Sequence, residues 1–81
     1  MPKTVQRVQT GLRIEKSLLK VLKATAEYTD LTLGDLIEGI VLHAFEGRSA
    51  FSGETLAAIA KFKELYGCGL TAGDSHTLIE E

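Results

Sequence analysis

The sequence predicts a mainly helical fold with one short N-terminal strand that pairs with the same strand of a second chain. Three observations predict it: a period-two alternation at residues 8–14, apolar stripes of helical spacing further along, and the small size of the chain. Eighty-one residues, 44% of them hydrophobic, form one domain near the lower limit for burying a self-sufficient core. A chain of this size often completes its core with a second copy of itself.

The strand is predicted from two sets of side chains that alternate along residues 8–14. One face carries Val8, Thr10, Leu12 and Ile14, and the other carries Gln9, Gly11 and Arg13. A lone strand cannot satisfy its own backbone groups, and no second strand candidate follows Glu15. We therefore expect antiparallel pairing with a second chain about a two-fold axis.

The second predicted helix has the clearest boundaries. Thr32 is a good N-cap, Asp35 three residues later resembles a capping box, and Gly47 supplies the stop. Its apolar stripe consists of Leu33, Leu36, Ile37, Ile40, Val41, Ala44 and Phe45. A helix this apolar on one side needs a cover of equal size, and a two-fold mate is the expected cover.

Two further helices are predicted around it. The first runs from about Glu15 to Tyr28, with Leu18, Leu19, Val21, Leu22 and Thr25 on its apolar side. The third begins at Ser52 as N-cap and ends near Tyr66, before Gly67. The tail from residue 71 onward is expected to be a loop that ends in a few extended residues.

Charge and composition narrow the function classes. The net charge is −2, but residues 1–30 hold six basic and three acidic side chains, and residues 31–81 hold three and eight. A dimer doubles the N-terminal excess of +3 and can gather it on one face. A single cysteine, Cys68, and the lack of a signal-peptide pattern or a long apolar run predict a cytoplasmic protein with no membrane contact.

No catalytic, metal-binding or cofactor-binding pattern is present, so we do not expect an enzyme. Cys68, Asp74 and His76 match no zinc-ligand spacing, and adjacent residues such as Asp74, Ser75 and His76 do not form a triad. His43 lies beside the apolar stripe and is expected to be partly buried or at an interface. Cys68 is expected to be an inert thiol.

Residues 8–46 resemble the ribbon-helix-helix regulators of bacteria, of the Arc, MetJ and CopG type. The resemblance rests on the run from Gln9 to Ile14, on the helix with Leu18 and Leu22, and on the run from Asp30 to Asp35. It implies a dimerisation and DNA-binding domain at residues 1–46. Residues 47–81 would be a C-terminal helical extension and tail packed on the same domain.

The resemblance also implies how DNA is bound. In this family a two-stranded ribbon enters the major groove, so the base-reading positions here are Gln9, Gly11 and Arg13. Arg13 can bond guanine and Gln9 can bond adenine, whereas Gly11 has no side chain and departs from the pattern.

Phosphate contacts are expected at two places. The N-terminus of the second helix offers the Thr32 hydroxyl and the N–H groups of Leu33 and Gly34, with the Asp35 charge as a second departure. Further phosphate contacts are expected from Lys3, Arg7 and Lys16.

These observations lead to two functional hypotheses. The first is a homodimeric, sequence-specific transcriptional regulator that binds a short palindromic operator in double-stranded DNA and is expected to repress transcription. Two such dimers side by side on adjacent half-sites would be compatible with the family. The alternative is a dimeric protein-interaction module, antitoxin-like or structural, that reads DNA weakly or not at all. The third helix either covers the core, which we favour, or binds a protein partner.

Overall fold

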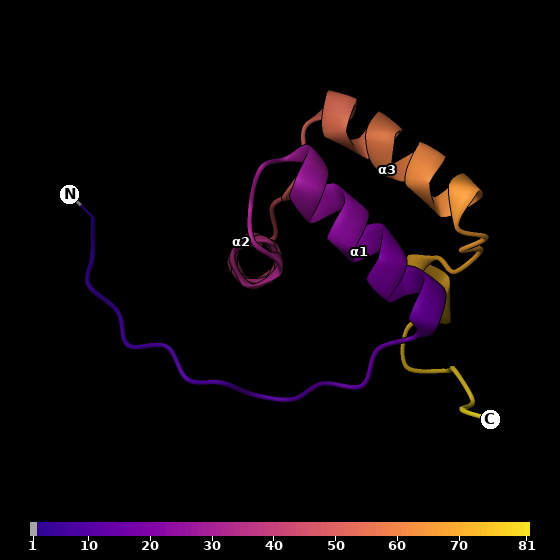
Figure 1. Ribbon diagram of the computed structural model, residues 1–81, viewed down its shortest axis with the longest axis horizontal. Helices are drawn as coiled ribbons and strands as arrows, with labels where there is room; N and C mark the ends of the chain where they lie inside the picture. Colours follow the sequence, from indigo (N-terminus) through magenta and orange to yellow (C-terminus); the bar gives the residue numbers. More distant parts are fainter. Residues whose placement is uncertain (1) are drawn as a thin grey trace.

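The computed structural model describes residues 2–81 and contains three α-helices and one 3-10 helix (Figure 1). Their bounds are Lys16–Tyr28 for α1, Leu33–Phe45 for α2, Gly53–Leu65 for α3 and Ala72–Asp74 for the 3-10 helix η1. The central element is α1, and both α2 and α3 pack against it. Within the described part of the chain, no helix is long and apolar enough to cross a membrane.

Local side-chain chemistry determines where the helices begin and end. The Glu15 carboxylate accepts hydrogen bonds from the N–H groups of Ser17 and Leu18, so α1 begins one residue after the predicted start. The Thr32 hydroxyl caps α2 by accepting from the N–H of Asp35, at 3.1 Å. The predicted N-cap is therefore confirmed, and so is the predicted stop, because Gly47 follows the helix with a φ of +69°. The capping box predicted with Asp35 is wrong, since the Asp35 carboxylate does not bond back to Thr32.

The third helix follows the same logic. The Ser52 hydroxyl accepts from the N–H of Thr55 at 3.2 Å, and Gly67 follows the last turn with a φ of +66°. Beyond it, the tail predicted to be a loop contains η1, whose start is stabilised by Asp74. The Asp74 carboxylate accepts from the backbone N–H of Thr71 at 2.8 Å.

The core is small and lies along α1. Its buried apolar residues are Val21, Ala26, Leu36 and Cys68. Thr25 is also buried, and its hydroxyl donates to the carbonyl of Val21 at 2.7 Å, which removes the cost of burying it. Beside the core, Tyr28 and Phe62 pack edge to face and join α1 to α3, with ring centroids 6.0 Å apart.

Most of the apolar stripe predicted on α2 lies outside this core. Of the thirteen residues of α2, all within the described chain, Leu36 alone is buried. Leu33, Ile37 and Ile40 are half-buried, and Phe45 is 82% exposed. The stripe exists as predicted, but a single chain provides no cover for it.

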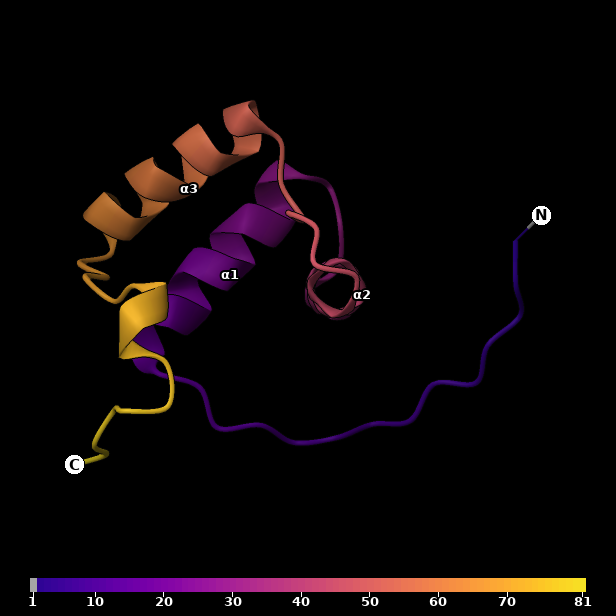
Figure 2. The same cartoon turned by 180° about the vertical axis from the view of Figure 1, so that it is seen from behind.

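The predicted N-terminal strand, and with it the ribbon-helix-helix fold, is wrong: residues 2–81 contain helices and no strand. Residues 2–15, which we call the arm, form an extended segment that leaves the start of α1 and curves past α2 (Figures 1 and 2). A strand exists through the ladder of hydrogen bonds to a neighbour, and no other segment of the described chain forms one with the arm. The alternation of side chains therefore correctly predicted that the arm is extended, but the strand pairing that was predicted from it is wrong.

The molecule is more open than a typical folded chain of its mass. It exposes 7048 Å² of surface, whereas a folded monomer of 8.8 kDa exposes about 4,800 Å². The radius of gyration is 13.8 Å, compared with about 12 Å expected for 81 residues. The arm and the uncovered side of α2 account for this openness.

Candidate nucleic-acid interface

The arm has two different faces, and they follow the alternation in the sequence. Val8, Thr10, Leu12 and Ile14 line an open groove of about 840 Å³ between the arm and α2. Gln9, Gly11 and Arg13 lie outside this lining and are exposed. One face of the arm is thus turned toward the protein, and the proposed base-reading face is turned to solvent.

The opposite wall of the groove is apolar. Leu33 and Ile37 of α2 and Leu19 of α1 contribute half-buried side chains to it. Val8 is 85% exposed and Leu12 is 67% exposed, so the arm does not close over this wall. The groove therefore has an uncovered apolar wall with the arm along one edge, and its lining also includes the charged residues Arg7, Asp35 and Glu38.

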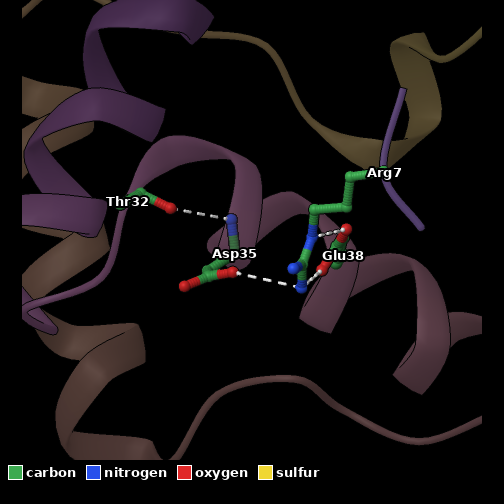
Figure 3. A network of polar contacts seen from close by, with 4 residues as sticks. All are labelled: Arg7, Thr32, Asp35 and Glu38. Carbon is green, nitrogen blue, oxygen red and sulfur yellow. Dashed lines mark hydrogen bonds and ion pairs between the residues drawn. The ribbon is translucent and has the colours of Figure 1, made fainter. Parts of the chain in front are cut away.

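A cluster of charges joins the arm to α2, as Figure 3 shows. Nε and Nη2 of Arg7 each donate to a carboxylate oxygen of Glu38 at 2.9 Å, and Nη2 also lies 3.7 Å from Oδ1 of Asp35. The hydrogen bond to Glu38 raises the pKa of Arg7, and the same bond lowers the pKa of the Glu38 carboxyl. All three side chains are largely solvent-exposed, so salt screens this cluster.

The charge cluster changes how the N-terminus of α2 can act as a phosphate site. Thr32 is engaged as the cap, and Asp35 faces Arg7 instead of returning a hydrogen bond to Thr32 (Figure 3). The N–H groups of Leu33 and Gly34 belong to the first turn, where no intrahelical acceptor exists. The structure brings Arg7 and these residues together, but two carboxylates and one guanidinium leave one net negative charge beside them.

Arg13, the main predicted base reader, also has an acidic partner. Its Nη2 donates to Oε2 of Glu80 at 2.6 Å, and the two side chains are 83% and 67% exposed. Lys3 and Lys16 are exposed, with Lys16 at the first position of α1. The structure therefore pairs both arm arginines with carboxylates.

Sequence reasoning missed both acidic partners. Glu38 is 31 residues from Arg7 and Glu80 is 67 residues from Arg13, and no local pattern signals contacts over such distances. The predicted partial burial of His43 is wrong, because the residue is exposed in the single chain, with Nδ1 2.6 Å from the carbonyl of Gly39 one turn earlier; its alternative position at an interface stays a prediction.

Other candidate ligands do not gather into a site. Cys68 is buried just after the end of α3. Among residues 2–81, no three histidine, cysteine, aspartate or glutamate side chains lie close enough together to hold a metal ion.

No family model matches the chain, and neither the curated proteins nor the solved structures contain a match to it.

Proposed function

We propose that this protein is a DNA-binding transcriptional regulator that acts as a homodimer and contacts DNA through the solvent-facing side of its arm. The observation that carries the proposal is the two-faced arm, with Gln9 and Arg13 directed away from the groove. Known N-terminal arms that carry arginine enter the minor groove, and the wider major groove, which admits a two-stranded ribbon and exposes the base edges that arginine and glutamine recognise, also has room for an extended arm. The proposal does not require a strand, because the alternation of side chains is present in the extended arm.

The side chains on the solvent face suit base recognition. A guanidinium can donate two hydrogen bonds to guanine, and a carboxamide can both donate to and accept from adenine. Gly11 lies between Gln9 and Arg13 with open space around its Cα, which lets the backbone approach the DNA closely. Lys3 and Lys16, together with the first turn of α2, would contact phosphates and set the register.

A homodimer explains the surface that a single chain leaves uncovered. The excess over a typical monomer is about 2,300 Å² per chain, or about 4,600 Å² for two chains, which lies within the range of obligate dimer interfaces. The apolar wall of the groove and the exposed stripe of α2 belong to the same side of the helix, so one two-fold interface can cover both. Dimerisation also places two arms, each with its basic excess, on one particle.

The proposed mechanism is occupancy of an operator. Phosphate contacts place the dimer on the duplex, and the two copies of Arg13 and Gln9 select bases in two half-sites, so the operator is a palindrome. A dimer that covers a promoter in this way represses transcription. Because the chain carries a net charge of −2, few phosphates are neutralised, and affinity should fall with salt by a slope of about −0.9 per neutralised phosphate.

Selection from random duplex DNA tests the proposal directly. The native protein should enrich a palindromic motif, and Arg13→Ala should weaken or broaden it at a cost of about 1–3 kcal/mol per recognised base pair. Arg48→Ala is the matched control, since it removes the same charge from an exposed arginine outside the arm. Absence of any enriched motif at low salt, or equal effects of the two variants, would contradict base reading by Arg13.

A second candidate function is a dimeric protein-interaction module that does not read DNA. It is favoured by the pairing of Arg7 and Arg13 with carboxylates and by the exposed apolar residues Leu42 and Phe45 near the end of α2. The same selection separates the two functions. A stable dimer that ignores DNA at low salt supports the interaction module.

A further inference from the structure

The last part of the C-terminal tail, residues 75–81, returns to the arm. Glu80 lies 67 residues after Arg13, yet its carboxylate accepts a 2.6 Å hydrogen bond from the Arg13 guanidinium. Figures 1 and 2 show the tail running past the start of α1, where the arm departs. The acidic end of the chain therefore lies beside the proposed base-reading residue.

A series of contacts beyond α3 positions the tail. The Lys63 ammonium donates to the carbonyl of Leu70 at 2.6 Å, and Asp74 caps η1 through the backbone of Thr71. Leu18 of α1 and Leu78 of the tail then line the same groove, of about 290 Å³. Glu80 follows two residues later, so the course of the tail beside α1 brings its carboxylate near Arg13.

We propose that the tail is a built-in competitor of DNA, in which Glu80 occupies the Arg13 guanidinium until a base or phosphate displaces it. This inference rests on the proposed function. A carboxylate and a phosphate both accept hydrogen bonds from a guanidinium, and the negative charge of Glu80 opposes the approach of a phosphate, so the two compete for Arg13. The tail therefore weakens binding to every duplex, operator and nonspecific DNA alike.

The exposure of the pair determines the size of the effect. Arg13 and Glu80 are both more than half exposed, and exposed ion pairs change equilibria by a factor of about 2 to 5. Salt screens the pair, so the competition should be largest at low ionic strength. The Arg13–Glu80 contact lowers the affinity for every duplex by a similar factor, and Gln9 and Arg13 still determine which bases are preferred.

The test compares Glu80→Gln with Glu81→Gln, which removes the same charge from the neighbouring residue. We expect Glu80→Gln to bind random-sequence duplex about 2 to 5 times more tightly than the native protein at low salt, with a smaller gain at high salt. Glu81→Gln should give little gain, and Glu80→Gln should give none when combined with Arg13→Ala. Equal gains from the two tail variants would overturn the proposal, because they would reflect net charge alone.

A measurement without DNA tests the contact itself. In the Arg13→Ala variant, the backbone amides of residues 78–81 should show changed chemical shifts and faster motion in nitrogen-15 NMR spectra. Unchanged tail signals would overturn the contact. If the native protein binds no DNA, the proposed function fails and the competitor role fails with it; if it binds DNA but Glu80→Gln matches Glu81→Gln, only the competitor role fails.

Discussion

Substitution of Ile37 by aspartate should dissociate the proposed dimer. Ile37 is half-buried in the wall of the groove between the arm and α2, so a single chain can turn a carboxylate at this position toward water. In a dimer that covers the groove, the same carboxylate would be buried without a partner. Because Ile37 is already half-buried in the single chain, completing the burial of its side chain in a dimer is worth about half of the full value, or about 0.8–1.5 kcal/mol per chain.

Two chains contribute to each dimer, so the loss expected from burial alone is about 1.5–3 kcal/mol, which raises the dimer dissociation constant by about tenfold to a hundredfold, and the buried carboxylates raise it further. Sedimentation equilibrium over a range of protein concentrations measures this constant, and circular dichroism at the same concentrations reports the helix content. Leu42→Asp is the matched control, because Leu42 belongs to the same helix, is 63% exposed and lies outside the groove lining. A native protein that stays monomeric at every concentration would refute the reasoning, as would an Ile37→Asp variant that dimerises as well as Leu42→Asp.

Two further predictions concern stability and charge. Leu36→Ala should lower the free energy of unfolding by about 2–5 kcal/mol, because Leu36 is the buried side chain that joins α2 to the core. Urea denaturation measures this loss, and a change below about 1 kcal/mol would show that other side chains hold α2 on the core. The pKa of Glu38 should lie below its ordinary value and should return toward it in Arg7→Gln, and carbon-13 NMR can follow this titration. The ion pair that attaches the arm to α2 is therefore present above the ordinary carboxyl pKa and is lost as the pH falls through the lowered pKa. A Glu38 titration that is the same in both proteins would contradict the Arg7 contact.

The parts of the fold that sequence predicted correctly are those encoded by neighbouring residues. Thr32, Ser52, Gly47 and Gly67 act within one turn of the helix that they begin or end, so the bounds of α2 and α3 follow from local chemistry. The alternation at residues 8–14 likewise predicted which side of the arm meets the groove.

The parts that failed depend on contacts between distant segments. A strand requires a neighbour, and the described chain does not provide one for the arm. The acidic partners of Arg7 and Arg13 come from α2 and from the tail, and no spacing rule connects them. Sequence therefore identified the candidate contact residues but not the charges that compete for them.

The sparse attachment of α2 has a consequence for the lifetime of a chain that has no partner. With Leu36 as its one buried side chain, α2 is expected to open before α1, in which Val21, Thr25 and Ala26 are buried, and its amides should exchange hydrogen for deuterium before those of α1. An opened α2 presents an unfolded, leucine-rich segment to cellular proteases, which degrade chains in proportion to the time they spend open. Newly made copies that fail to assemble would be cleared quickly, so the abundance of the protein would depend steeply on its rate of synthesis.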